Sequence, residues 1–322
     1  MANGGADKNM AVRNKKGIFL TTLTLFLLSL FLLSYSISYM GEKRDATNKR
    51  ISTMNNFLIS MEKDMSRQLY ISGYRIVFAW GDEVFKYGKY IKNVSYAAEE
   101  AFFNGTVNGV ENQFLIEPGT SYTFNSINES LNENAKKIGV EIFMDKPRIL
   151  ISQDDPWNVK ITLISEFLMK DKAGLAMWNK TSIISAEIPI ENFEDPVFVV
   201  NKVPRKIIET NLTFSTLDRN NLSIHFNNKY YINNTHAPSF LDRLQGNLTI
   251  ESPYGIESFV DLDELSLQEV DLDLTKSIVD YVYFSTENPL PFCAGGGLLP
   301  PLPSWFKIDS TNGRCALYGL SP

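Results

Sequence analysis

The sequence has few of the residues on which most enzymes and metalloproteins depend. Among its 322 residues there are two cysteines and two histidines, His225 and His236. No His-Glu-x-x-His, Gly-x-Ser-x-Gly or phosphate-binding Gly-x-x-x-x-Gly-Lys motif occurs. Two thiols without a neighbouring histidine leave a tetrahedral metal ion short of ligands. We therefore expect a non-enzymatic protein without catalytic residues, metal or cofactor, in which both histidines have surface or hydrogen-bonded roles.

An excess of basic charge is also missing. The chain contains 31 Lys and Arg against 37 Asp and Glu, which gives a formal net charge of −6. Since a nucleic-acid-binding surface needs a concentrated positive field, this dispersed distribution argues against nucleic acid as a partner. The apolar share of 44% and the aromatic share of 12% are typical of a folded protein.

Charge is absent altogether from the 22 residues between Ile18 and Tyr39. At ~1.5 Å rise per residue, a helix of this length covers the ~30 Å hydrocarbon thickness of a bilayer. A cleaved secretory signal is the alternative, but its apolar core is shorter, and Ser34, Ser36 and Ser38 match its small-residue cleavage site poorly. We therefore expect one membrane-spanning helix at residues 18–39, with lipid as its partner.

The basic residues that flank this segment do not decide its orientation. Four precede it and four follow it: Lys8, Arg13, Lys15 and Lys16, then Lys43, Arg44, Lys49 and Arg50. The orientation follows instead from eight Asn-x-Ser/Thr sequons, all beyond the span, at Asn93, Asn104, Asn128, Asn179, Asn211, Asn221, Asn233 and Asn247. We therefore expect a cytoplasmic basic leader at residues 1–17 and an extracellular, N-glycosylated remainder in the cell membrane.

The two cysteines, Cys293 and Cys315, lie in a Gly- and Pro-rich C-terminal segment, residues 291–322. An exported chain favours a disulfide between them, and closing a loop of this size contributes ~3 kcal/mol in the chain-entropy model. Two separate buried thiols are the alternative.

Residues 40–109 have the pattern of an amphipathic helical stem. Apolar residues recur at intervals close to a heptad, at Ile51, Met54, Leu58, Met61, Met65, Leu69 and Ile76. No proline occurs before Pro118, and Gly41 is only a weak breaker. We expect a nearly continuous helix from Ile18 to about Tyr90, helical structure to Asn104, and burial of this apolar stripe against the rest of the chain or a second copy.

Residues 110–290 show the alternation of β-strands. Apolar residues alternate with polar ones in three segments: Trp157 to Leu163, Ile184 to Ile190 and Leu222 to Phe226, and residues 278–284 form a run of strand-forming residues. The predicted fold class is α+β, with a long N-terminal transmembrane and amphipathic helix followed by a mostly antiparallel β ectodomain.

Carboxylates gather at Asp261, Asp263, Glu264, Glu269, Asp271 and Asp273. Their spacing of two favours a solvated strand face over a calcium site, which would need a closing glycine and glutamate. The pairs Asp154–Asp155 and Glu194–Asp195 each precede proline and are interpreted as turn residues rather than an acid/base pair.

The segment Asn14-Lys15-Lys16-Gly17, followed directly by the apolar run from Ile18, resembles the class III signal of archaeal type IV pilins and related surface proteins. In that family a membrane peptidase cuts after the small residue, which here is Gly17. The match departs from the usual pattern in having Ile18 where a polar residue is common.

A second resemblance covers more of the chain. Five segments resemble archaeal surface proteins of uncharacterised function with pilin-like N-termini: residues 152–157, 190–196, 238–244, 255–260 and 303–307. This resemblance implies an archaeal source and a non-enzymatic surface role. The expected protein partners, through the N-terminal helix, are further copies of this chain or other pilin-like subunits.

The leading hypothesis is a membrane-anchored surface protein of pilin-like architecture, either a minor filament subunit or a stationary envelope protein. A ligand-binding or sensory ectodomain, with Trp157, Trp178 and Trp305 as contacts, is the alternative. A membrane-tethered hydrolase is the third hypothesis, and would require acidic residues that meet in a cleft with perturbed ionisation.

Overall fold

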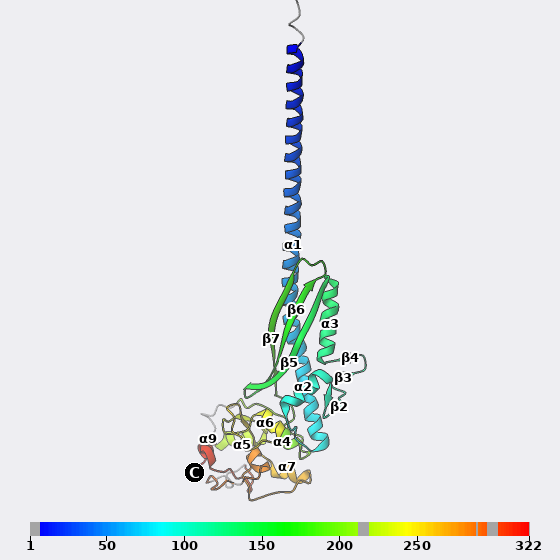
Figure 1. The fold of residues 1–322 in the computed structure, drawn as a ribbon. Coiled ribbons are helices and arrows are strands. Elements are labelled where there is room, and N and C mark those ends of the chain that lie inside the picture. Colours follow the sequence, from blue (N-terminus) through cyan, green and yellow to red (C-terminus); the bar gives the residue numbers. More distant parts are fainter. Residues whose placement is uncertain (1–6, 212–218, 288, 295–301, 322) are drawn as a thin grey trace, which may run out of the picture.

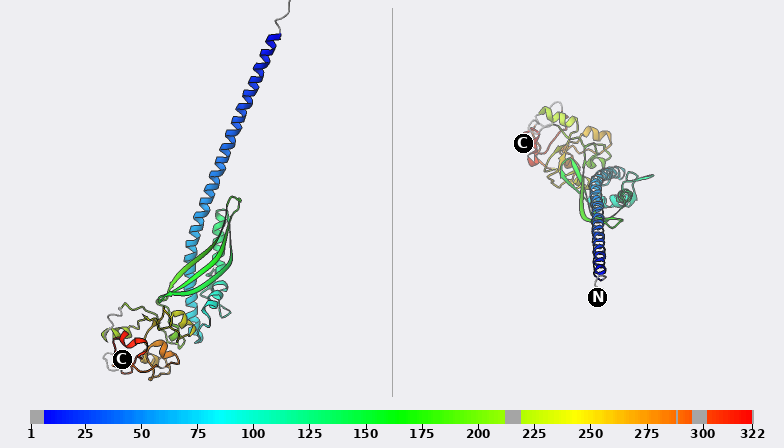
Figure 2. Two further views of the ribbon diagram at one scale, coloured as in Figure 1. Left: turned by 60° about the vertical axis from the view of Figure 1, so that its left-hand side comes forward. Right: turned by 90° about the horizontal axis from the view of Figure 1, so that it is seen from above.

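The protein is an elongated molecule in which a single helix projects from a folded body (Figure 1). The computed structural model describes residues 7–211, 219–287, 289–294 and 302–321. Helix α1, Asp7–Tyr87, has 81 residues; its N-terminal half stands alone and its C-terminal half packs on the body. Two further views show the same separation (Figure 2).

Helix α1 is continuous through the predicted span and through the predicted stem as far as Tyr87, as the absence of proline indicated. It ends where Gly88 takes a left-handed φ of 62°. A second helix, α2 at Val94–Asn104, begins after Asn93 caps it and ends at Gly105, with φ 71°. The predicted helix to about Tyr90 is thus confirmed, and so is the predicted end near Asn104; the break at residues 88–93 divides the two helices.

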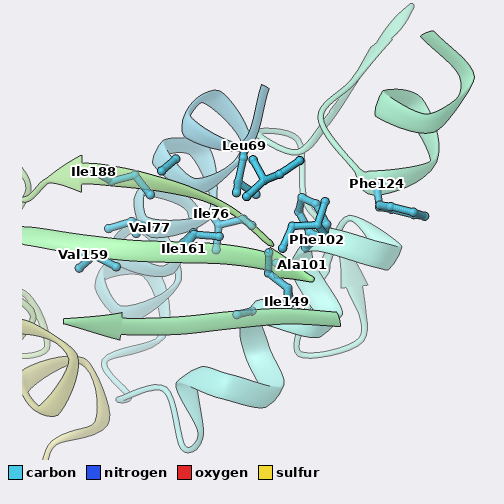
Figure 3. Close-up of a cluster of buried hydrophobic side chains, with 14 of the residues drawn as sticks. Leu69, Ile76, Val77, Ala101, Phe102, Phe124, Ile149, Val159, Ile161 and Ile188 are labelled. Atoms are coloured by element: carbon cyan, nitrogen blue, oxygen red, sulfur yellow. The ribbon is translucent and has the colours of Figure 1, made fainter. Parts of the chain in front are cut away.

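The apolar stripe of α1 is buried by the body, as predicted, except for its first residue. Met54, Leu58, Met61, Met65, Leu69 and Ile76 are at most 8% exposed, whereas Ile51 is 40% exposed. Figure 3 shows Leu69 and Ile76 meeting Ile161 and Ile188 of the sheet, with Phe102 of α2 beside them. Each such side chain contributes ~1.5–3 kcal/mol by leaving water, so α1 is part of the core.

Gly73 marks the closest approach of α1 to the sheet. A Cβ atom at this position would clash with the terminal methyl carbons of Ile161 and Ile188. Glycine is costly inside a helix, at ~1 kcal/mol relative to alanine. Its use here is explained by the space that the two isoleucines occupy.

The central sheet has three antiparallel strands in the order β5–β6–β7, namely β5 Val140–Asp155, β6 Asn158–Asp171 and β7 Met177–Pro189. The alternations around residues 157–163 and 184–190 correctly predicted β6 and β7. Val159, Ile161 and Leu163 face α1 and pair with Ile188, Ala186 and Ile184 of β7. The sheet therefore covers one side of the helix along much of its buried length.

Smaller elements precede the sheet. They are the hairpin β1–β2 (Thr106–Val107, Val110–Glu111), the hairpin β3–β4 (Ile116–Glu117, Thr120–Ser121) and helix α3, Phe124–Lys137. The expectation of period-two structure from residue 110 onward is wrong for α3. Its buried residues, Phe124, Ile127, Leu131 and Ala135, follow helical spacing.

The chain beyond the sheet forms a C-terminal lobe, residues 191–321, with its own apolar core. Its described residues form short helices and one two-stranded pair: α4 Pro196–Val199, α5 Arg219–Asn227, β8 Ile232–Asn233, α6 Phe240–Gln245, β9 Ile256–Glu257, α7 Leu262–Leu267, α8 Asp280–Phe284, the 3₁₀ turn Thr311–Gly313 and α9 Arg314–Leu317. The lobe lies at the end of the body farthest from the free half of α1 (Figure 1).

Three strand predictions in this lobe are wrong. Residues 222–226 belong to helix α5 and most of residues 278–284 to helix α8. The carboxylates from Asp261 onward do not share a strand face either, because Asp261 caps helix α7 with bonds from the N–H groups of Asp263 and Glu264. Packing in the second core decides these conformations over local β propensity.

The molecule is therefore α+β, with a long apolar N-terminal helix followed by antiparallel strands. The strands are concentrated between residues 106 and 189.

Candidate functional site

The most distinctive surface is the free segment of α1, Gly17 to Met40. Every residue in it is exposed, and its large apolar side chains range from 44% exposed at Leu23 to 72% at Met40. Within the part of the chain that the structure describes, α1 is the one helix long and apolar enough to cross a membrane. By length and composition, α1 could therefore act as a membrane span.

Four hydroxyl groups inside the free segment, those of Thr21, Thr22, Thr24 and Ser29, are bonded to the helix itself. Thr22 donates to the carbonyl oxygen of Ile18 at 2.8 Å, and Ser29 donates to that of Phe26 at 2.8 Å. Thr21 and Thr24 make equivalent bonds one turn back. These side chains thus need no water as a partner, which suits an apolar environment.

The residues of the predicted signal, Lys15 to Ile18, lie inside α1. Gly17 and Ile18 are helical, Ile18 is 63% exposed, and nothing approaches within 4 Å of the Gly17 Cβ position. Lys15 and Lys16 also fall in α1, although their side chains lie outside the described part of the structure. The bond between Gly17 and Ile18 is therefore uncovered by the body.

Arg50 bonds the body to α1 at a defined position along the helix axis. Its guanidinium donates to the carbonyl oxygen of Gly139 at 2.9 Å and to the Asp171 carboxylate at 2.7 Å. Burial acts to raise the pKa of Asp171, but the Arg50 bond and charge and the N–H of Leu175 outweigh it, so the pKa is lowered. The ends of β5 and β6 are thereby tied to one helix turn.

Most of the predicted glycosylation sites are accessible. The exposed asparagines are Asn93, Asn104, Asn179, Asn211, Asn233 and Asn247, while Asn128 and Asn221 are half-buried within helices α3 and α5. Asn93 accepts a bond from the N–H of Tyr96 through Oδ1, which leaves Nδ2, the atom that carries a glycan, unused in that bond. The sequon at Asn211 extends into residues outside the described part of the chain.

The predicted disulfide between Cys293 and Cys315 is confirmed. Their Cα atoms are 5.4 Å apart, within the range that a disulfide requires. Both cysteines belong to the C-terminal core, together with Leu302. The Gly295-Gly296-Gly297 run between them lies outside the described residues.

A buried ionic cluster in the C-terminal lobe was not predicted from the sequence. Arg243 on α6 is fully buried, and its Nη1 lies 2.7 Å from Asp195 and 3.0 Å from Asp280. Tyr231 also donates to Asp195, at 2.8 Å. Burial raises the pKa of Asp280 to about 6, with Arg243 opposing the rise and Asp195 adding to it. Asp195, predicted as a turn residue, does begin helix α4, but it is also part of this cluster.

A second charged group lies nearby in the same lobe. Arg314 contacts Asp309 and lies 3.6 Å from Glu257, whose carboxylate also accepts a bond from Tyr318 at 2.5 Å. Burial acts to lower the pKa of Arg314, but the surrounding acidic and phenolic groups outweigh it and raise that pKa. All four side chains are buried, so these charged groups interact with one another inside the lobe and are closed to a substrate.

The two histidines have different environments. His236 lies 3.0 Å from Glu251, as expected for a hydrogen-bonded surface residue. His225 is buried between the rings of Tyr230, Phe259 and Tyr318, and neither ring nitrogen has a partner among the described residues. The expected surface or hydrogen-bonded role is thus wrong for His225. Burial lowers its pKa to about 4.

The tryptophans considered as ligand contacts are half-buried against the two cores. Trp157 and Trp178 pack on the core of α1 and the sheet, and Trp305 packs on Phe226, its indole N–H donating to Asp263 at 3.2 Å. A hollow of 530 Å³ between α2 and the β1–β2 turn is lined by other residues, including Asn93 and Asn104.

Acidic residues of the predicted strand face are hydrogen-bonded to different partners. Glu264 bonds to Arg205 and Lys229, and Asp273 bonds to Thr275. No group of three or more Asp, Glu, His or Cys side chains within the described ranges is arranged to hold a metal ion. Of the predicted acid pairs, Asp154 is exposed and bonded to Lys160 at 2.7 Å, whereas Glu194 accepts a bond from the N–H of Arg205 at 2.7 Å.

No protein-family model, curated protein or solved structure matches this chain.

Proposed function

We propose that this chain is a single-pass membrane protein that presents an exported body at the cell surface through a pilin-like helix. The observation that carries this proposal is the difference between the two halves of α1. One half is buried by the sheet, and the other is apolar on every side and touches nothing in the described body. A surface of this kind needs another apolar environment to cover it.

The size of the free segment suits a bilayer. Its 22 uncharged residues cover ~33 Å at ~1.5 Å per residue, close to the ~30 Å hydrocarbon thickness. Leaving each large apolar side chain in water costs roughly 1.5–3 kcal/mol. Backbone groups inside the helix are bonded internally, and Thr22 and Ser29 return their hydroxyls to the backbone.

The sequons and the disulfide support an extracellular position for the body. All eight sequons follow the span, and six of their asparagines are exposed. Disulfides persist outside reducing compartments. With residues 1–17 in the cytoplasm, the body would carry glycans and the Cys293–Cys315 bond on the outer side.

In this proposal α1 holds the protein in the membrane and the body is displayed at the cell surface, and the protein does not catalyse a reaction. The resemblance of its N-terminal segment to archaeal pilins favours an archaeal surface protein, either a minor filament subunit or a solitary envelope protein. In a filament, helices of neighbouring subunits would cover the free segment; in a solitary protein, lipid would do so.

Membrane integration can be tested with a matched pair of double variants. Leu27→Arg with Leu28→Arg places two charges in the free segment, at a cost of ~2.5–3.5 kcal/mol each. Wild type should resist alkaline extraction of membranes, and this variant should be released. A surface control, Lys89→Arg with Lys92→Arg, should remain in the membrane. Release of the wild-type chain would overturn the anchor.

Topology and processing are tested on the same cells. Protease added outside should remove the body and leave the N-terminal part, whereas complete protection would refute an extracellular body. Sequencing of the mature N-terminus should begin at Ile18 if the signal is cut, and at Met1 or Ala2 if α1 is an uncleaved anchor. Sedimentation of sheared surface material then separates a filament subunit from a solitary protein.

A further inference from the structure

One end of the body faces the membrane if α1 is the anchor. This end consists of the last residues of α3, Lys136 and Lys137, and the β6–β7 hairpin, Lys170–Met177, which we call the basic tip. It lies where the free half of α1 leaves the body (Figure 1). Arg50 binds Asp171 and the carbonyl oxygen of Gly139 there, so the tip has a fixed position on the helix.

The tip carries a cluster of exposed positive charge. Lys136, Lys137, Lys170 and Lys172 are all exposed. Asp171, the one carboxylate inside the hairpin, is neutralised by Arg50. Glu141, which pairs with Lys170 across the ladder, offsets one of the four charges.

The opposite end of the body has the opposite charge. Residues 191–321 contain 17 acidic and 9 basic residues, a formal net charge of −8. The molecule is therefore polarised along its length, with its basic end toward the free segment and its acidic end away from it (Figure 1).

Apolar side chains accompany the lysines on the hairpin. Leu175 is 41% exposed and Met177 is 64% exposed. Lysines around exposed apolar residues are a combination found on proteins that rest on membrane interfaces. Both groups project from the same hairpin, which joins β6 to β7.

The distance between the tip and the bilayer is short. Eleven residues separate Tyr39, the end of the uncharged segment, from Arg50, which corresponds to ~16 Å of helix. The headgroup layer fills ~5–7 Å of this. The remaining gap of ~10 Å is close to one Debye length at physiological salt. A tilt of ~20°, which is common for membrane helices, brings the tip closer still.

We propose that the basic tip is a docking surface for the anionic lipid headgroups of the bilayer that holds α1. The lysines contact the headgroups, Leu175 enters the interfacial layer, and the body leans toward this side. The proposal rests on the proposed membrane anchor and goes beyond it by assigning a second contact with the same membrane.

The test uses the full chain reconstituted in bilayers. A spin label on Ala173→Cys, introduced with the Cys293–Cys315 disulfide intact, reports collisions with a nickel chelate attached to lipid headgroups. In zwitterionic bilayers containing about 30% anionic lipid, collisions should rise about tenfold over the purely zwitterionic bilayer. In about 1 M salt they should return to the lower value, because the Debye length shortens to ~3 Å.

Two variants that each remove four positive charges distinguish an effect of the basic tip from an effect of the molecule's net charge. Lys136→Gln, Lys137→Gln, Lys170→Gln and Lys172→Gln together should abolish the rise with anionic lipid. The control changes four exposed lysines elsewhere on the body to glutamine, namely Lys86, Lys89, Lys92 and Lys206. It should preserve the rise, and a loss of the rise in the control would overturn the assignment of the effect to the tip.

Flotation of the reconstituted protein with lipid vesicles separates two results: that α1 is not a membrane anchor, and that the basic tip does not bind lipid. Flotation with every type of bilayer shows that α1 is inserted; no flotation would refute the anchor itself. Flotation without any dependence of collisions on anionic lipid would refute only the tip. Collisions that rise with protein density in zwitterionic bilayers would also refute it, and would assign the tip to the acidic lobe of another copy.

Discussion

The two cores of the body are built differently. The helix–sheet layer, residues 50–190, packs apolar side chains of α1 against β6 and β7, and its charges, such as Arg50 and Asp171, lie at its edges. The C-terminal lobe has an apolar core too, but fully buried Arg243, Asp195 and Asp280 run through it. Apolar packing therefore holds the first region in place. In the second region buried charges lie within the core as well, and the ring nitrogens of His225 have no hydrogen-bond partner among the described residues. The first should tolerate changes of pH, and the second should not.

The largest effect is expected from Arg243→Met. The substitution leaves Asp195 and Asp280 buried without a positive partner, which costs about 3–5 kcal/mol of unfolding free energy. Denaturant titration measures this loss. Adding Asp195→Asn and Asp280→Asn to the same variant should recover part of it, because the orphaned charges are then gone. A single-variant loss below about 1 kcal/mol would show that the charges do not stabilise the lobe.

Leu69→Ala tests the apolar region. Leu69 is 1% exposed, and its truncation should cost about 2–5 kcal/mol. Leu28→Ala removes the same atoms from the free segment of α1, where Leu28 is 56% exposed, and should change the unfolding free energy of the body by less than about 0.5 kcal/mol. Equal losses at the two positions would mean that the two halves of the helix are not distinct.

His225→Phe tests the expected pH sensitivity of the lobe. The pKa of His225 is lowered from 6.5 to about 4, so the folded protein keeps the ring neutral while the unfolded chain binds a proton below pH 6.5. Stability from this residue is therefore present above pH 6.5 and is lost as the pH falls toward 4, by roughly 3 kcal/mol.

The measurement is the difference in unfolding free energy between His225→Phe and wild type at several pH values. This difference should grow as the pH falls from 6.5 to 4. The contribution of Asp280, whose raised pKa acts in the opposite direction, is common to both proteins and cancels. His236→Gln is the surface control and should track wild type. A constant difference across this range would contradict the lowered pKa of His225.

The smallest changes in stability are expected from alanine substitutions at two glycines of α1. Gly73→Ala should destabilise the body by about 1–3 kcal/mol, because the added methyl group meets Ile161 and Ile188. Gly81→Ala, at a position with nothing within 4 Å, should stabilise it by about 0.5–1 kcal/mol through helix propensity. Thermal unfolding compares the two, and opposite signs are the decisive result.

The sequence predicted the first region better than the second. Long-range helical periodicity identified α1, and strict alternation identified β6 and β7, because each of these elements buries one face. The helix α3 carried a helical pattern in Phe124, Ile127 and Leu131 that was outweighed by the surrounding strand signals.

The C-terminal lobe was less predictable because its elements are short. Five residues of α8 and nine of α5 are too few to show a period, and apolar residues in them fit strands equally well. The disulfide could be predicted, since only two cysteines exist. The meeting of Asp195, Arg243 and Asp280 could not, because these residues are far apart in the chain and only the tertiary fold brings them together.

The continuity of α1 also determines how the molecule responds to pulling. Tension between the membrane and the body would act along the axis of a single helix, which has buried side chains from Met54 to Val84, a length of ~45 Å. When force acts in this direction, the buried side chains of α1 must move past the sheet all at once, in shear. They do not separate from the sheet one after another. Arg50, the first contact below the free segment, takes the load first. With α1 as the proposed anchor, the packing of α1 on the body would resist force applied through this helix.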